Sequence, residues 1–276
     1  MATAVAVKNF VQISGNGQQP IMFAHGFGCD QNMWRFVAPS FEGRYKVVLF
    51  DHVGCGRSDP SAYKIERYST LDGYAHDIVE IAEANDLKDI IFVGHSVSSM
   101  MGILAAKMAP ERFSELILIV PSACYIDTPP DYAGGFSRSD LEGLLDLMEK
   151  NFVGWASFLA PKVMGNDDQP DLQKELTTSF CAADPAIARR FAAVTFLSDH
   201  RGDLGGLIQP SLILQWSDDA MAPASAIDFV HRKLSGSTLH LLSATGHCPH
   251  MTHPAETTAA INRYLDRGAV TRRQEH

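Results

Sequence analysis

Cysteine is scarce in this chain of 276 residues, and its five thiols form no recognisable framework. Cys29, Cys55, Cys124, Cys181 and Cys248 are odd in number and far apart, and no two of them form a CxxC pair. Disulfide-rich secreted domains and structural zinc sites need paired or regularly spaced cysteines. The pattern argues against both classes, and we expect free thiols in a reducing, cytoplasmic environment.

Two further absences narrow the class of protein. No apolar run approaches the roughly 20 residues that cross a bilayer, and the opening MATAVAVKNF lacks the long apolar stretch of a signal peptide. The net charge is -9, so there is no basic excess for binding nucleic acid or an anionic membrane. Hydrophobic residues make up 46% of the chain, which is an ordinary globular balance. We therefore expect a globular protein with neither kind of partner.

Short apolar runs rich in β-branched residues alternate with amphipathic stretches along much of the chain. Runs of this kind, bounded by turn signals, are typical of strands buried on both faces of a parallel sheet. The stretches between them place apolar residues at helical spacing, so the alternation predicts βαβ units and a doubly wound sheet. The expected strands are 21–25, 47–50, 90–94, 116–120, 211–216 and 237–242, and the expected helices are 69–86, 97–109 and 254–266.

The alternation is interrupted between residues 127 and 200, where no convincing strand pattern occurs. A loop rich in turn formers opens this stretch and helical patterns follow, one of them starting with Asp184-Pro185, an N-cap followed by proline. Ligands of open α/β sheets bind outside the carboxyl ends of the strands, where an insertion would act as a lid. We expect a core formed by residues 1–126 and 201–269, and a helical lid at 127–200.

The strongest chemical signal is Gly94-His95-Ser96-Val97-Ser98, which follows one expected strand and precedes an expected helix. A G-x-S-x-G motif in this context is typical of a nucleophile elbow, a strained turn that projects the serine into the site. Ser98 replaces the second glycine with the next smallest reasonable residue. A serine that merely caps the helix is the simpler alternative. Agreement with the signals below favours Ser96 as the nucleophile of an α/β hydrolase.

A serine hydroxyl needs a base within hydrogen-bond reach, and His247 has the best claim among eleven histidines. It follows the last expected strand, where the α/β-hydrolase order Ser…Asp…His places the base. The side chain of His95 projects from the position next to Ser96 in the sharp turn, so we expect it to pack in the core or to line the pocket. His250 and His253 follow at three-residue steps and suggest a metal site, but no nearby acidic residue completes a ligand set. We expect neither a metal nor another cofactor.

The acid of the triad should follow the expected strand at 211–216, and two aspartates stand there. Asp219 begins Asp-Ala-Met-Ala-Pro, which is similar to the D-x-x-V-P ending that is common at this turn. We therefore favour Asp219, and Asp218 is the alternative. The acid would hold the tautomer of the imidazole and stabilise the imidazolium.

Two backbone amides are expected to hold the oxyanion. His25-Gly26-Phe27-Gly28 follows the first expected strand, in the position of the HGGG-type loop of lipases and esterases. The donors would be the N–H groups of Phe27 and Val97, each contributing about 3–4 kcal/mol. Phe27 would also place an aromatic wall beside the reacting carbonyl.

Segments along nearly the whole chain resemble the RsbQ-like α/β hydrolases, the family of a stress-response regulator of Gram-positive bacteria and of the related plant karrikin and strigolactone receptors. They include HGFGCDQNMW, FDHVGCGRSD, VGHSVSSMMG, LDLMEKNFVGWASFLAP and ATGHCPHMTHP, and the plant receptors share GHSVS. The expected fold is a mostly parallel, doubly wound sheet with a four-helix lid inserted after the sixth core strand, enclosing an apolar pocket. Packing within the lid would equally explain most of the matching pocket positions, which are Phe27, Val97, Tyr125, Leu144, Trp155, Leu159, Phe196 and Met221.

The resemblance implies hydrolysis, because members of the family cleave small hydrophobic esters or lactones. The first hypothesis is a serine hydrolase that cleaves a small apolar ester, lactone or enol ether through an acyl-Ser96 intermediate, in a signalling context. The second is a ligand receptor with slow turnover that regulates a stress-response phosphatase as its protein partner. The third is a C–C bond hydrolase, in which Arg189 and Arg190 would bind a substrate carboxylate, although a solvated helix face explains them more simply.

Overall fold

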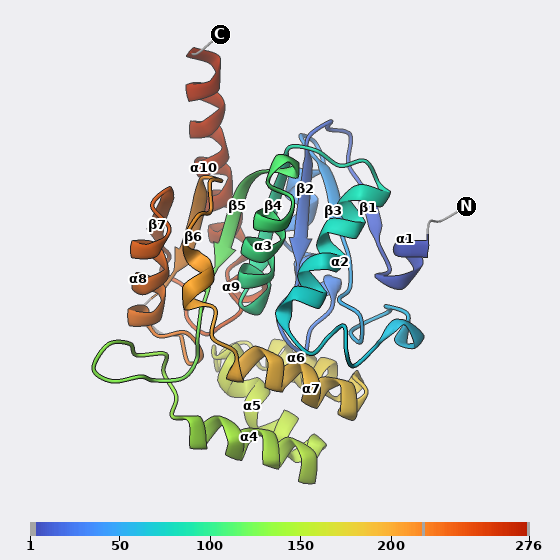
Figure 1. Ribbon diagram of the computed structural model, residues 1–276, viewed down its shortest axis with the longest axis vertical. Helices are drawn as coiled ribbons and strands as arrows, with labels where there is room; N and C mark the ends of the chain where they lie inside the picture. The colour runs from blue at the N-terminus through green and yellow to red at the C-terminus, as the bar shows by residue number, and fades with distance from the viewer. Residues whose placement is uncertain (1–3, 217–218, 275–276) are drawn as a thin grey trace.

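The computed structural model describes residues 4–216 and 219–274. Its centre is a seven-stranded sheet in the order β1-β3-β2-β4-β5-β6-β7 (Figure 1). β1 pairs antiparallel with β3, and the other neighbouring strands are parallel. This arrangement confirms the mostly parallel sheet. The strands are β1 (Gln12–Ser14), β2 (Pro20–Ala24), β3 (Lys46–Leu49), β4 (Ile90–His95), β5 (Phe113–Ile119), β6 (Ser211–Gln215) and β7 (Ser237–Leu241).

The helices of the core explain why the central strands read as continuous apolar runs. Every residue of β2, β4 and β6 is buried. In Figure 1, α2 (Leu71–Ala84) and α3 (Val97–Met108) lie in front of the sheet. α8 (Ala224–Lys233) packs against β6 and β7, and α10 (Pro254–Gln274) packs against β6. The shorter elements are α1 (Ala4–Lys8), α9 (Pro249–Thr252), and the 3-10 helices η1 (Gln31–Trp34), η2 (Ala38–Phe41), η3 (Pro60–Ala62), η4 (Pro110–Arg112) and η5 (Arg201–Leu204).

Four helices form a lid beyond the carboxyl ends of the strands (Figure 1). Polar side chains begin three of them: Ser137 caps the first, Asn151 the second and Asp184 the fourth, each accepting a backbone N–H. Asn151 therefore divides a stretch that reads as one long helical pattern. The helices are α4 (Arg138–Lys150), α5 (Phe152–Met164), α6 (Pro170–Ala182) and α7 (Pro185–Leu197), and they confirm the expected four-helix lid.

The structure corrects three details of the predicted elements. Within the described residues, five strands precede the lid, so the prediction that it follows the sixth strand was wrong. One of the five, β1, was missed because it has only three residues, all exposed, and shows no alternation. The last helix runs past residue 266 to Gln274. Arginine, alanine and glutamine are good helix formers, and they allow the helix to continue beyond its expected end at residue 266.

The order of the strands determines where the site can form. β2 and β4 are neighbours although β3 lies between them in the sequence, and Ala24 is in register with Gly94. The loops that follow these two strands therefore leave the sheet side by side. In open α/β sheets, this kind of position is the crevice in which ligands bind.

Within the described ranges, none of the helices combines the length and the apolar character that a bilayer crossing requires.

Candidate active site

Ser96 occupies a strained turn between β4 and α3. Its backbone has φ +55° and ψ -122°, a conformation that residues other than glycine rarely adopt. The N–H of Ser96 donates to Ile119 O at 2.8 Å, which anchors the turn to β5. Gly94 allows the helix to pass closely, because a Cβ at that position would lie 2.6 Å from Ser98 O. The geometry is that of a nucleophile elbow.

His247 joins the Ser96 hydroxyl to a buried carboxylate. Its Nε2 lies 2.8 Å from Ser96 Oγ, and its Nδ1 lies 2.9 and 2.8 Å from the two carboxylate oxygens of Asp219. The side chains of His247 and Asp219 are 6% and 1% exposed, so bulk water does not compete for these bonds. The arrangement allows the imidazole to accept the serine proton while the carboxylate stabilises the resulting charge.

Asp219 is held by its own turn as well as by His247. Its Oδ1 accepts the N–H groups of Met221 at 2.7 Å and Ala222 at 3.0 Å. The Trp216 Nε1–H donates to Gly246 O, which ties the end of β6 to the loop that carries His247. The alternative acid, Asp218, lies outside the described residues.

The loop after β2 lies beside the Ser96 turn, as the pairing of β2 with β4 requires. Val97 is the first residue of α3, and the first N–H groups of a helix have no acceptor within the helix. The ring of Phe27 packs against Phe191 and Phe196 of the lid, with centroids 5.4 and 5.5 Å away. One expected oxyanion donor, Phe27, is thus in the loop after β2, and the other, Val97, begins α3 beside that loop.

A small, partly enclosed cavity of about 30 Å³ adjoins Ser96. Tyr125 contributes its hydroxyl, which lies 3.3 Å from Ser96 Oγ. This volume is far below the roughly 300 Å³ of a typical small-molecule site, so we expect the lid to move when a substrate binds. The expected pocket residues that line this cavity are Phe27, His95, Tyr125, Leu159, Phe196 and Met221.

Three expected pocket residues are not on this cavity: Val97, Leu144 and Trp155. Leu144 lies on α4, which contacts α5 and α7, so this half-buried side chain packs within the lid. Trp155 stacks on Phe180 at 5.1 Å and meets Phe27 edge-on at 6.1 Å, so it supports the cavity wall from behind. The sequence missed six lining residues. Helical patterns do not distinguish a cavity wall from packed core, which explains the four on lid helices: Val163, Leu176, Phe180 and Thr195. The other two, Cys29 and Cys248, lie outside the helices and strands.

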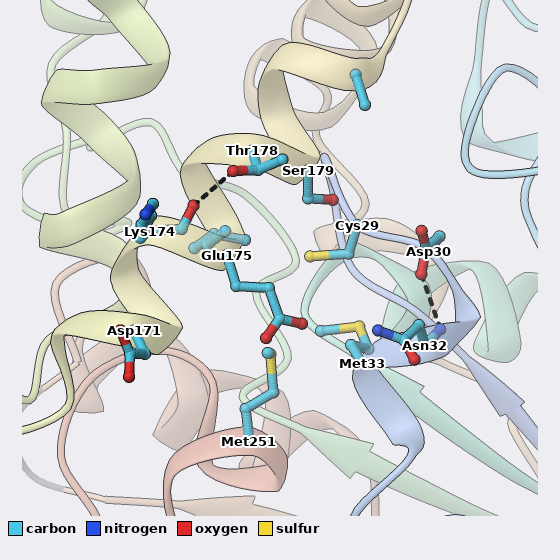
Figure 2. Close-up of a pocket in the computed structure, with 12 residues that line it drawn as sticks. Cys29, Asp30, Asn32, Met33, Asp171, Lys174, Glu175, Thr178, Ser179 and Met251 are labelled. Carbon is cyan, nitrogen blue, oxygen red and sulfur yellow. Dashed lines mark hydrogen bonds between the residues drawn. The ribbon is translucent and has the colours of Figure 1, made fainter.

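A second, open pocket of about 450 Å³ lies between α6 and the segment after β2 (Figure 2). Cys29 and Leu176 line both this pocket and the catalytic cavity, so they belong to the wall between the two. Arg35 and Glu175 form two hydrogen bonds of 2.7 Å between the core and α6. This ion pair therefore holds α6 against the segment whose residues separate the two pockets.

Ser98, the departure from the second glycine of the motif, has a structural role that the sequence did not reveal. Its hydroxyl donates to His25 O and lies 2.8 Å from His52 Nε2. All three residues are fully buried. Ser98 therefore ties the nucleophile helix to the loops that follow β2 and β3.

We expect Ser98→Ala to lower the free energy of unfolding by about 1–3 kcal/mol, because it removes a buried hydroxyl and weakens the polar network around His52. Urea denaturation measures the effect. The control is Ser157→Ala, an exposed helical serine, which should change stability by less than about 0.5 kcal/mol. Equal stabilities of the two variants would contradict the assigned role.

The burial of His52 leads us to expect that the folded protein loses stability in acid. Burial, and secondarily the neighbouring His25, lowers the pKa of His52 well below its usual value. Below a pH of about 6.5, His52 binds a proton in the unfolded chain but not in the folded chain. The free energy of unfolding should therefore fall with pH below that point, by about 1.4 kcal/mol per pH unit for each such histidine.

Denaturation with urea between about pH 5 and pH 7 tests this slope. His52→Gln should reduce the slope by one proton, whatever its effect on absolute stability. His76→Gln, at an exposed position, should leave the slope unchanged. The expectation fails if both variants keep the wild-type slope.

Comparisons with known proteins agree with the observed fold. Residues 19–254 match the family described as alpha/beta hydrolase fold. The Karrikin insensitive 2 receptor CA of Petunia hybrida is 36% identical over 92% of this chain and 94% of that protein. Strigolactone esterase D14 of Arabidopsis thaliana is 35% identical over 93% of this chain and 96% of that protein.

Among solved structures, a hydrolase from Oleispira antarctica superimposes with a TM-score of 0.93 and is 43% identical, covering 95% of this chain and 96% of that one. The similarity therefore includes the lid as well as the sheet. The predicted resemblance to karrikin and strigolactone receptor hydrolases is confirmed by these relatives. From the strand order, the turn at Ser96 and these matches, the chain belongs to the α/β-hydrolase fold family.

Proposed function

We propose that this protein is a serine hydrolase of the carboxylesterase or lactonase type, acting on a small hydrophobic ester, lactone or enol ether. The observation that carries the proposal is the position of His247, whose two nitrogens lie 2.8 Å from Ser96 Oγ and 2.8 Å from Asp219. Membership of the α/β-hydrolase family supports it, and so does similarity to a relative named as an esterase.

In the proposed acylation step, Ser96 Oγ attacks the carbonyl carbon of the substrate while His247 Nε2 accepts the hydroxyl proton. Asp219 stabilises the imidazolium, and the N–H groups of Phe27 and Val97 hold the oxyanion. When the tetrahedral intermediate collapses, His247 returns the proton to the leaving oxygen, and the acyl group stays on Ser96. A water molecule, deprotonated by His247, then releases the acid and restores the serine.

The cavity supports a small and mainly apolar substrate. Phe27, Leu159 and Phe196 give it apolar walls, and the lid excludes bulk water from the acyl-enzyme. Thr195 also lines it, and its buried Oγ1 has no hydrogen-bond partner among the described residues. We infer that this hydroxyl binds a polar atom of the substrate, because an unpaired buried hydroxyl is costly.

A ligand receptor with slow turnover is the second candidate. The receptor named among the relatives is similar over nearly the whole chain, and the small cavity of about 30 Å³ is consistent with a lid that rearranges around its ligand. In this case the lid would present a changed surface to a protein partner, for which a phosphatase-type regulator is the class implied by the family resemblance.

No observation favours the C–C bond hydrolase. Arg189 pairs with Glu149 of α4 at 2.8 Å, and both Arg189 and Arg190 line a separate surface pocket beside Tyr63. Neither arginine is among the residues that line the catalytic cavity. Both fit the simpler interpretation of a solvated helix face.

Turnover of p-nitrophenyl acetate and p-nitrophenyl butyrate separates the two candidates. A hydrolase should release many equivalents of p-nitrophenol per protein molecule without any partner. A receptor should stop near one equivalent, keep an acyl mass on Ser96 and show a shifted melting temperature. Complete absence of both release and adduct would overturn the proposed chemistry.

A further inference from the structure

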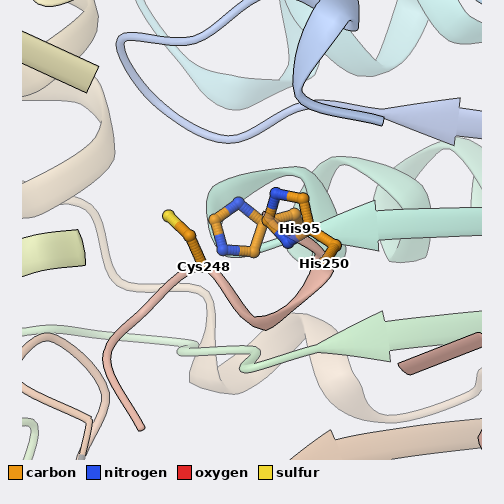
Figure 3. A group of neighbouring side chains, drawn as sticks. All are labelled: His95, Cys248 and His250. Atoms are coloured by element: carbon orange, nitrogen blue, oxygen red, sulfur yellow. The ribbon is translucent and has the colours of Figure 1, made fainter. Parts of the chain in front are cut away.

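Behind His247, three buried side chains with metal-binding atoms come together: His95, Cys248 and His250 (Figure 3). One nitrogen from each imidazole and the Cys248 sulfur all lie within 4.8 Å of one another. His95 is the last residue of β4, Cys248 follows His247 directly in the chain, and His250 lies in α9. The three side chains are 2%, 1% and 0% exposed, so they form an enclosed cluster.

The one hydrogen bond described for the His95 ring leaves its other nitrogen without a partner among the described residues. Its Nε2 lies 2.7 Å from the carbonyl oxygen of His247, and a carbonyl only accepts, so Nε2 carries the proton. The lone pair of the neutral ring is therefore on Nδ1, which packs against Gly26 and has no hydrogen-bond partner in the described part of the chain, so binding an ion through Nδ1 requires the ring to turn away from Gly26. A histidine whose other N–H donates to a backbone carbonyl is the usual arrangement at metal sites.

His250 has the same property in a stronger form. Neither of its ring nitrogens has a hydrogen-bond partner among residues 4–216 and 219–274, although the ring is fully buried between His95 and Trp34 at centroid distances of 4.5 and 4.6 Å. Among the described residues, two buried rings with unpartnered nitrogens thus lie side by side in this cluster.

We propose that His95, Cys248 and His250 form a binding site for a thiophilic divalent cation such as Zn²⁺. Two imidazoles and one thiolate supply three protein ligands and leave the fourth position for water. Zinc–nitrogen and zinc–sulfur bonds of about 2.0 and 2.3 Å place ligand atoms roughly 3.5 Å apart in a tetrahedron. The side chains would therefore move inward by up to about 1 Å, and the thiol would release its proton to solvent.

Metal binding at this position would inhibit the enzyme, a consequence that rests on the proposed function. His95 and Cys248 line the catalytic cavity, and Cys248 follows His247 directly in the chain. Drawing the Cys248 sulfur and the His95 ring toward an ion would strain the hydrogen bond from His95 to the His247 backbone. His247 would then lose its alignment with Ser96.

Titration of the EDTA-treated full-length protein with Co²⁺, followed by competition with Zn²⁺, tests the site directly. We expect one equivalent of Co²⁺ to produce a thiolate-to-metal charge-transfer band that Zn²⁺ abolishes. Cys248→Ser should remove the band and weaken Zn²⁺ binding by at least about 100-fold, and His250→Phe, which keeps a ring beside Trp34, should weaken it similarly. The matched controls, Cys124→Ser at another buried thiol and Cys181→Ser at an exposed one, should keep the band.

Absence of a charge-transfer band in the folded wild type would overturn the proposal, as would a band that persists in Cys248→Ser. The wild-type titration does not depend on any variant folding, and circular dichroism establishes which variants have folded. For inhibition, saturating Zn²⁺ should reduce ester hydrolysis by at least tenfold, and EDTA should restore it. Because the spectroscopic test needs no substrate, failure of the proposed esterase function would be seen separately from failure of the metal site.

Discussion

Replacement of Ser96 by alanine is expected to lower kcat/KM for p-nitrophenyl butyrate by about 10⁴-fold or more. The variant keeps the cavity and the backbone amides near the turn, but it has no atom that can carry the acyl group. Because Ser96 sits at φ +55°, alanine there inherits the same backbone strain, and the stability of the fold should change little. The loss should therefore appear in kcat and in the mass of the acylated protein.

Ser122→Ala provides the matched control. Ser122 is also buried, and its hydroxyl donates to Cys124 O, away from the triad. This variant should retain activity within a few-fold of the wild type. If Ser96→Ala kept more than a tenth of the wild-type rate, another nucleophile would have to be sought.

Asp219→Asn should reduce kcat by about 10⁴-fold, as the equivalent change does in serine proteases. In the native protein, the carboxylate accepts the His247 Nδ1–H and two backbone N–H groups. An asparagine has a single acceptor oxygen. If this oxygen serves Met221 and Ala222, the amide NH₂ faces the imidazole and forces the proton onto Nε2. The tautomer is then unable to accept the Ser96 proton.

Asp218→Asn is the decisive comparison, because the sequence left both aspartates open. We expect this variant to keep the wild-type rate within a few-fold. Steady-state kinetics on p-nitrophenyl acetate measures both variants, with circular dichroism to establish folding. A large loss in Asp218→Asn and none in Asp219→Asn would transfer the role to Asp218.

The elements that position the nucleophile could be predicted because their signals are local. A strand, a sharp turn and a helix within residues 90–108 constrain one another, so the motif around Ser96 indicates its own geometry. The lid pocket was harder to predict. Leu144 and Trp155 have the same apolar spacing as Leu159, but only Leu159 lines the catalytic cavity. Periodicity shows which face of a helix is buried, not whether that face meets packed core or an empty space.

The histidines illustrate the same limit. From the sequence, His247, His250 and His253 form a spaced set without an acidic partner, which argues against a metal. In the structure, His250 meets His95 and Cys248 instead, and His95 is distant in sequence. Such a cluster depends on the pairing of strands and loops that no local pattern encodes.

By itself, the sequence determined the alternating architecture, the interruption by a helical lid, the turn at Ser96 and the position of His247 after the last strand. These features follow from hydrophobic periodicity and from residues that a tight turn requires. Only the tertiary structure brought His247 within 2.8 Å of Ser96, left a cavity of about 30 Å³ beside it and gathered His95, Cys248 and His250 together. The physical reason is that these contacts join segments more than 100 residues apart, and the packing of the sheet and lid, rather than any local preference, sets their distances.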